Sequence, residues 1–228
     1  MTDGLVVERL ARVRERIAAA QERAGLTHPV TIIAVTKGHG PEAVRSAVAA
    51  GLIDVGENRV QEALAKQEAL GQIGARWHLI GSLQRNKARQ AVGRFVAIHS
   101  VDRAELAEEL ARRVAPDQRQ RVLVEVNCSG EAQKGGVNPD GARALVDLIL
   151  ARPTLEFGGL MTMAALTDDE RIQRAAFARL RGLKETLEQS GIRVDDLSMG
   201  MSGDFEAAVT EGATMVRLGT ILFGERER

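Results

Sequence analysis

The chain has 228 residues, of which 44% are hydrophobic and 27% charged, and its 31 basic side chains balance 31 acidic ones. This length suits one α/β domain, while the balanced charge and the lack of any apolar run of roughly 20 residues give no sign of a nucleic-acid or membrane partner. The single cysteine, Cys128, cannot form an internal disulfide, so we expect one soluble, cytoplasmic domain that spans residues 1–228.

The first predicted element is an amphipathic helix close to the N-terminus. Val6, Leu10, Val13 and Ile17 recur at helical spacing, and Asp3 precedes them as a candidate N-cap. This helix comes before the regular alternation of elements described next, so we expect it to be an addition to the main fold.

Strands and helices alternate along the rest of the chain. Short apolar or β-branched runs predict eight strands, at Val30–Thr36, Ile53–Val55, Trp77–Ile80, Phe95–His99, Arg121–Asn127, Leu155–Met161, Asp196–Met199 and Met215–Leu218.

Start signals mark several of the helices between these strands. Pro139 follows Asn138 as a first-turn proline after a cap. The segment 167–170 has the pattern of a capping box, and Asp102 with Glu105 resembles the same device.

Strands that alternate with helices need right-handed crossovers and therefore form a parallel sheet. Eight such units in a domain of this length most economically close into a (β/α)8 TIM-type barrel. A doubly wound open sheet is the competing topology, but the segment 37–40, Lys-Gly-His-Gly, does not fit the Gly-x-Gly-x-x-Gly motif expected after its first strand. The sequence therefore predicts the barrel.

Lys37 is the most informative position for function. It follows the apolar run 32–35 at the end of the first strand, and barrels of this type carry their functional groups at the carboxyl ends of the strands. Inside the barrel mouth, burial and nearby cations would favour a neutral amine that can form an imine with a carbonyl. The alternative is a lysine that leaves the strand into solvent.

The loops after the last two strands predict a phosphate site. Ser202 with Gly203, and Gly219 with Thr220, supply hydroxyls and exposed amides where such barrels usually bind phosphate. Ser202 could also be an ordinary helix cap. Arg217 precedes this site, and a guanidinium beside a pyridine nitrogen would keep that nitrogen unprotonated; a surface arginine is the alternative.

Three further residues at the predicted mouth allow two roles each. Asn58 could donate to a phenolate oxygen or cap the following helix, and His78 could line the site or be a satisfied structural histidine. Cys128 has no dedicated base and more often would be a packing residue. The histidines show no metal-ligand spacing with cysteine or carboxylate, so we predict no metal.

Several sequence blocks, in order along nearly the whole chain, resemble those of one family, the pyridoxal phosphate homeostasis proteins. The blocks are Ala34–Lys37, Gly56–Asn58, Trp77–Gln84, Gly159–Met163, Leu197–Ser202 and Val216–Thr220.

The resemblance implies a fold-type III barrel like the N-terminal domain of alanine racemase, with pyridoxal 5'-phosphate (PLP) as its cofactor. Lys37 would carry PLP as a Schiff base, Arg217 would face the pyridine nitrogen, and Asn58 would line the cofactor. The phosphate would be held by Ser202, Gly219 and Thr220. One departure is that Gly38 to Gly40 replace the family's usual residues after the Schiff-base lysine, so a second lysine for cofactor exchange is absent there.

The resemblance also implies a carrier that controls free PLP and supplies it to apo-enzymes. A PLP-dependent amino-acid racemase is the alternative, but a two-base mechanism needs groups on both faces of the cofactor, and the chain has no tyrosine. Related racemases also add a C-terminal β domain, which we expect to be absent after Arg228. A phosphate-sugar isomerase with Glu57 as its base would leave Lys37 unexplained. We therefore predict a carrier without catalytic residues, and a monomer, since nothing demands a dimer.

Overall fold

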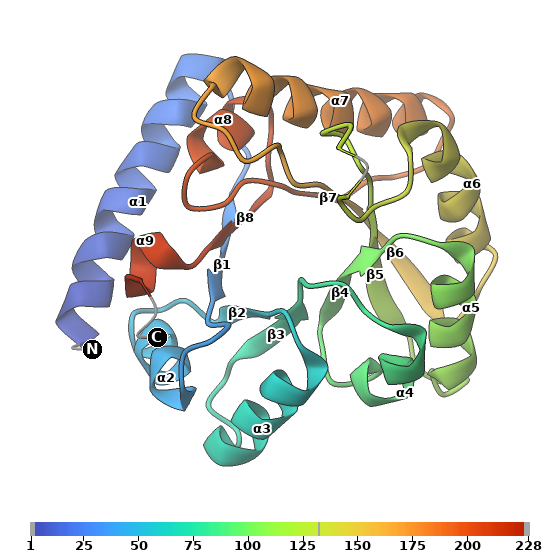
Figure 1. The fold of residues 1–228 in the computed structure, drawn as a ribbon, viewed down its shortest axis with the longest axis horizontal. Coiled ribbons are helices and arrows are strands. Elements are labelled where there is room, and N and C mark those ends of the chain that lie inside the picture. Colours follow the sequence, from blue (N-terminus) through green and yellow to red (C-terminus); the bar gives the residue numbers. More distant parts are fainter. Residues whose placement is uncertain (1–2, 132, 226–228) are drawn as a thin grey trace.

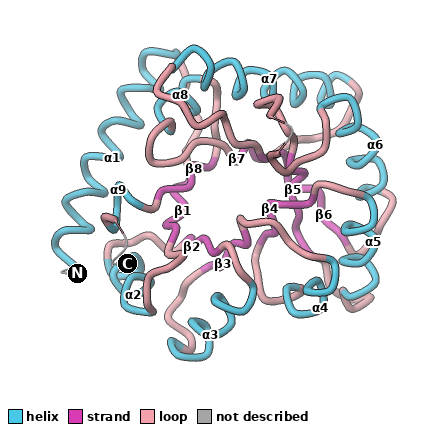
Figure 2. The backbone as a smooth tube through the Cα atoms, in the orientation of Figure 1, coloured by secondary structure: helices cyan, strands magenta, loops and turns pink. Residues whose placement is uncertain are grey.

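The computed structural model describes residues 3–131 and 133–225. Within these residues the strands close into one parallel barrel in the order β1 to β8, and β8 pairs back with β1 (Figures 1 and 2). The strands are β1 (Thr31–Val35), β2 (Asp54–Glu57), β3 (Arg76–Leu79), β4 (Ala97–Val101), β5 (Gln120–Glu125), β6 (Leu155–Met161), β7 (Asp196–Ser198) and β8 (Met215–Leu218).

The predicted (β/α)8 barrel is confirmed, and each predicted strand overlaps an observed one. Figure 1 looks down the barrel and shows the helices as a ring around it. The helices are α1 (Asp3–Ala24), α2 (Pro41–Ala49), α3 (Val60–Leu70), α4 (Ala88–Ala91), α5 (Ala104–Arg113), α6 (Pro139–Leu150), α7 (Glu170–Gln189), α8 (Phe205–Thr210) and α9 (Thr220–Phe223), with a short 3-10 turn, η1 (Arg85–Lys87).

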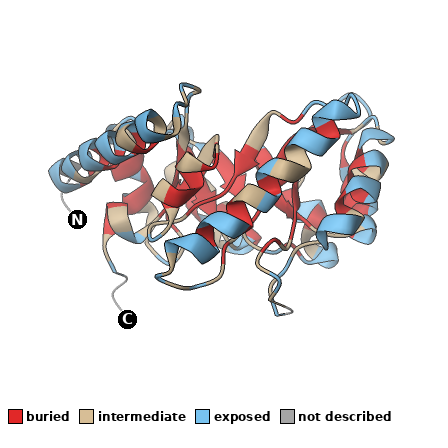
Figure 3. Cartoon of the chain, turned by 90° about the horizontal axis from the view of Figure 1, so that it is seen from above, coloured by how far each residue is buried: buried red, intermediate tan, exposed pale blue. Residues whose placement is uncertain are grey.

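Helix α1 is the additional N-terminal element. Its predicted apolar face, Val6, Leu10, Val13 and Ile17, is buried, and the helix packs against α8, α9 and α2. The view in Figure 3 shows the general arrangement, with buried faces turned toward the barrel and exposed helix faces outside. Helix α1 therefore covers the part of the outer layer formed by α8, α9 and α2. No helix of the described residues is long and apolar enough to cross a membrane.

The helix starts are less regular than the sequence predicts. The Asp102 capping box is wrong, because Arg103 is the N-cap of α5 without a side-chain cap bond, and Asp102 instead pairs with Arg103. Asn138 precedes Pro139 at the start of α6 but makes no side-chain cap bond. The capping box at 167–170 is also wrong, because helix α7 begins at Glu170 and is capped by Asp169, whose carboxylate accepts from an amide of the first turn. The side chain of Asp3 lies outside the described residues.

Candidate functional site

A pocket of about 270 Å³ opens at the carboxyl end of the barrel beside Lys37. The residues that line it come from β1 and the connection after it, from the connection after β3, and from β8 and the loops after β7 and β8. They are Val35, Lys37, His39, Ile80, Met201, Ser202, Gly203, Arg217, Gly219 and Thr220. The closed barrel therefore gathers into one cavity the residues that the sequence predicted for the imine, the ring nitrogen and the phosphate.

The backbone on both sides of Lys37 is held by charged side chains of α3. The Lys66 ammonium donates to the carbonyl oxygen of Thr36 at 2.8 Å, and a Glu62 carboxylate oxygen accepts from the amide of Gly38 at 2.6 Å. Lys66 and Glu62 also pair with each other at 2.9 Å. These contacts fix the direction in which the Lys37 side chain leaves the end of β1.

Glu57 completes this cluster on the helix side of β2. Its carboxylate accepts from the Thr36 hydroxyl at 2.6 Å and from the Lys66 ammonium at 2.6 Å. Burial raises the pKa of the Glu57 carboxyl, whereas the bonds to Lys66 and Thr36 oppose that rise. Glu57 does not line the Lys37 pocket, so its position gives no support to an isomerase that would use it as a base.

The loops after β7 and β8 converge at the phosphate end of the pocket. The Ser202 hydroxyl accepts from the amides of Gly219 and Ile221, each at 3.3 Å. Asp204, rather than Ser202, is the N-cap residue of α8. Hydroxyls and backbone amides from two loops thus meet where an anion would be bound.

The turn after β7 depends on a glycine. Gly200 has a φ of 92°, which favours glycine, and a Cβ there would lie 2.6 Å from the side chain of Ala208. The Gly200 carbonyl accepts from the Arg217 amide at 2.9 Å, and the Asp204 carboxylate accepts from the Met201 amide at 2.5 Å. These contacts hold the loop that carries Ser202 against β8.

Arg217 is buried with only 4% of its surface exposed. Its Nη1 donates to the carbonyl oxygen and to the hydroxyl of Ser198, at 2.6 and 2.8 Å, and its Nη2 donates to the carbonyl oxygen of Thr162 at 2.9 Å. Burial lowers the pKa of Arg217 to about 10, and Asp204 and Glu125 oppose this shift. The guanidinium is therefore charged at neutral pH and held in one orientation, unlike a surface arginine.

Asn58 and His78 do not line the pocket that gathers the other predicted residues. Asn58 lines a separate hollow with Gln84 and Lys87, and it is not the cap of α3, which is Arg59. His78 is buried, and both of its ring nitrogens are engaged by protein groups. Its position supports the structural role and gives no support to contact with a cofactor.

Several residues of the site are not among those predicted from the sequence. Val35 and Ile80 line the pocket as inward-facing neighbours of the predicted groups, and period-two alternation from Lys37 and His78 could have found them. His39 also lines it, and its ring lies 5.7 Å from that of Phe223. Lys66 could not have been found, because its contact with the end of β1 depends on how α3 docks.

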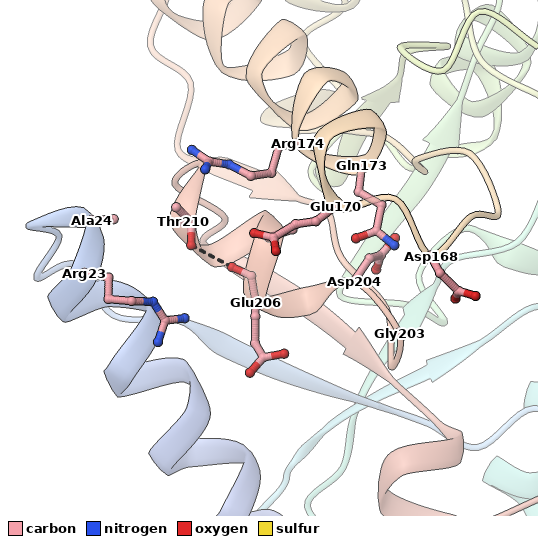
Figure 4. A pocket seen from close by; sticks show the side chains of 11 residues that line it. Arg23, Ala24, Asp168, Glu170, Gln173, Arg174, Gly203, Asp204, Glu206 and Thr210 are labelled. Carbon is pink, nitrogen blue, oxygen red and sulfur yellow. Dashed lines mark hydrogen bonds between the residues drawn. The ribbon is translucent and has the colours of Figure 1, made fainter.

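A larger and more polar hollow of about 740 Å³ lies beyond the β7–α8 loop. Figure 4 shows charged side chains of both signs around it, from α1, α7 and α8, including Arg23, Glu170, Arg174 and Glu206. It shares Gly203 with the Lys37 pocket but contains neither the lysine nor the converging amides. The residues that line the smaller pocket therefore make it the candidate functional site.

Comparison with known proteins agrees with this geometry. A model of the alanine racemase N-terminal domain family matches residues 9–227. The pyridoxal phosphate homeostasis protein of Aquifex aeolicus is 44% identical over 96% of this chain and 98% of its own, and that of Pseudomonas aeruginosa is 45% identical over 97% and 96%.

Solved structures show the same barrel. PipY of Synechococcus elongatus, with PLP bound, superposes with a TM-score of 0.84 at 39% identity, over 96% of this chain and 100% of PipY. Alanine racemase of Clostridium difficile is 16% identical with a TM-score of 0.76, over 97% of this chain and 61% of the racemase, which shows the fold alone. The chain therefore belongs to the pyridoxal phosphate homeostasis protein family, built on the barrel of the alanine racemase N-terminal domain.

Proposed function

We propose that this protein binds PLP covalently through Lys37 and holds it for supply to other enzymes. One observation carries the proposal: the amine of Lys37, the guanidinium of Arg217 and the amides and hydroxyls of two loops line a single pocket. PLP has an aldehyde, a ring nitrogen and a phosphate, and each has a matching group among these residues. When bound, PLP supplies an electrophilic aldehyde that forms a Schiff base with a neutral amine.

The phosphate end is assigned to Ser202, Gly219 and Thr220. The Ser202 hydroxyl already lies within hydrogen-bonding distance of the Gly219 and Ile221 amides. Backbone amides and hydroxyls arranged in this way bind a phosphate without a dedicated cation. These residues would anchor the cofactor while leaving its aldehyde end at Lys37.

The chemistry of Arg217 favours a protein that holds the cofactor over an enzyme that catalyses a reaction on it. A guanidinium has donors only and stays charged at neutral pH. It would therefore donate a hydrogen bond to the pyridine nitrogen without transferring its proton, so that the ring nitrogen stays unprotonated. The ring then withdraws electrons less strongly from the aldehyde carbon. The bonds from Arg217 to Ser198 and Thr162 keep this donor in place.

An amino-acid racemase is the alternative, and the side chains in the pocket do not favour it. Proton transfer on two faces of a substrate needs two acid–base groups that face each other. Besides Arg217, the titratable residues that line the pocket are Lys37 and His39, which belong to the same connection between β1 and α2. The chain also contains no tyrosine. We therefore propose a carrier and assign no catalytic residue.

The covalent link is tested by reduction. Protein loaded with PLP and treated with borohydride should carry a phosphopyridoxyl group on the peptide that contains Lys37, detected by mass spectrometry. Lys37→Ala should lose this adduct, whereas Lys184→Ala, which removes a lysine of α7 outside the pocket, should retain it. An adduct that persists in Lys37→Ala would place the site elsewhere.

Supply and catalysis are separated by two further measurements. Loaded protein should activate an apo-enzyme that depends on PLP, and the rate should be compared with that given by free PLP at equal concentration. Incubation with L-alanine or L-serine should leave the L-form unchanged. Substantial formation of the D-form would overturn the carrier assignment.

A further inference from the structure

A continuous chain of hydrogen bonds crosses the inside of the barrel and ends on Arg217. Asp54 of β2 lies 2.9 Å from Nε2 of His78 on β3, and Nδ1 of His78 lies 2.9 Å from Nε2 of His99 on β4. Nδ1 of His99 lies 2.9 Å from the hydroxyl of Ser198 on β7, which accepts from Nη1 of Arg217 at 2.8 Å. The chain therefore links strands from opposite sides of the barrel.

The members of the chain are shielded from solvent. His78, His99, Ser198 and Arg217 are between 0% and 4% exposed, and Asp54 is 9% exposed. Buried polar groups are costly unless each donor has an acceptor, so the protons of such a chain must be arranged without conflict.

The donor-only character of Arg217 fixes this arrangement. Because the Ser198 hydroxyl accepts from Arg217, its own proton needs an acceptor, and its other partner is Nδ1 of His99. His99 must then carry its proton on Nε2 and donate to Nδ1 of His78. His78 in turn carries its proton on Nε2 and donates to the Asp54 carboxylate. Any additional imidazole proton would set two donors against each other.

The charges around the chain fit this assignment. Every donor points away from the Arg217 cation and toward the Asp54 anion, so the aligned dipoles stabilise both ends. Burial lowers the pKa of His99 well below its ordinary value, and the Arg217 and Arg121 cations lower it further. Arg76 contacts the Asp54 end of the chain at 3.3 Å.

We propose that Asp54, His78, His99 and Ser198 are positioning residues that orient the Arg217 guanidinium toward the cofactor through two neutral imidazoles protonated on Nε2. The inference rests on the proposed function for the identity of the cofactor. The chain acts on Arg217 and does not touch the cofactor itself, since neither imidazole lines the pocket.

The proton assignment can be measured on the protein without PLP. Nitrogen-15 NMR of the imidazoles at pH 8, assigned by comparison with His78→Gln and His99→Gln, should show both rings neutral with the proton on Nε2. A His99 ring that is cationic, or protonated on Nδ1, at this pH would overturn the assignment. This readout does not depend on PLP binding.

The positioning role is tested by interrupting the chain. His99→Phe leaves the Ser198 hydroxyl without an acceptor, so Arg217 loses the fixed geometry of one bond, and we expect the Kd for PLP to rise about tenfold. His99→Gln, which offers one donor and one acceptor, should recover part of the loss. His28→Gln is the control, because His28 bonds to the Ala213 carbonyl and is not part of the chain.

The outcomes distinguish this inference from the proposed function. If wild-type protein forms no adduct on Lys37, the proposed function is wrong. The proton assignment is still tested by NMR, because that measurement does not involve PLP. If the adduct forms and folded His99→Phe binds PLP as tightly as wild type, the positioning role is wrong. Should His99→Phe not fold, unchanged affinity in folded Asp54→Leu, which removes the last acceptor of the chain, would overturn it equally.

Discussion

Lys66 of α3 is buried beside the end of β1, where it contacts the carbonyl oxygen of Thr36 and does not line the Lys37 pocket. Its ammonium is 2.6 Å from Glu57 and 2.9 Å from Glu62, and only 5% of the residue is exposed. A buried ion pair adds little net stability over an apolar pair, but removal of one partner leaves an uncompensated charge. The pair therefore serves to hold the peptide next to Lys37 rather than to stabilise the barrel as a whole.

Lys66→Met should lower the free energy of unfolding by about 3–5 kcal/mol, because the Glu57 carboxylate loses its partner while staying buried. The double variant Lys66→Met/Glu57→Gln should recover much of that loss. Urea denaturation of the three proteins measures both effects. A single variant as stable as wild type would show that Glu57 is protonated or solvated and that the ion pair is not maintained.

At the scale of the element, helix α1 is the part of the fold that the barrel pattern does not require. It nevertheless buries an apolar face against α8, α9 and α2. Arg16 also pairs with Glu206 of α8 at 2.7 Å, but this bridge is exposed and contributes little. Apolar packing is therefore what attaches the helix to the barrel.

Leu10→Ala should destabilise the protein by about 2–5 kcal/mol, since it removes a buried side chain and leaves a cavity. Val7→Ala on the same helix is the matched control, because Val7 is 51% exposed and should change stability by less than about 0.5 kcal/mol. Denaturant midpoints of both variants give the comparison. Equal, small effects would mean that α1 is detached in solution.

At the scale of the whole molecule, the polar interior makes stability depend on pH. The pKa of the Glu125 carboxyl is raised from 4.5 to about 7, mainly by burial and further by Asp102. Between these two values the folded protein keeps this proton and the unfolded chain loses it. Stability from this group is thus fully present below pH 4.5 and is lost as the pH rises toward 7.

Glu125→Gln should remove this loss, because an amide does not titrate. Relative to wild type, the variant should gain on the order of 3 kcal/mol in free energy of unfolding between pH 4.5 and pH 8. Urea denaturation at the two pH values, with and without the substitution, measures the difference. If the difference in free energy of unfolding between the two proteins is the same at both pH values, Glu125 titrates normally in the folded state.

The single-domain organisation, the monomeric state and the cytoplasmic location stay predictions at this scale. Light scattering of purified protein should give the mass of one chain, 24.6 kDa. A mass of twice that value would contradict the monomer.

The sequence by itself determined the barrel and the residues at its mouth. Strand and helix periodicity are local properties, and a residue that follows a parallel strand must lie at the carboxyl edge of the sheet whatever the details of packing. Lys37, Arg217 and the loops of Ser202 and Gly219 could be placed together for this reason.

Only the tertiary structure decided which polar residues meet inside the barrel. Asp54, His99 and Ser198 belong to β2, β4 and β7, and their contacts exist only once the sheet closes and its register is set. In the closed barrel His78 contacts Asp54 and His99, and Asn58 lies outside the Lys37 pocket. Sequence periodicity gives the face of a strand but not the partner across the barrel, because that partner depends on strand stagger and side-chain reach.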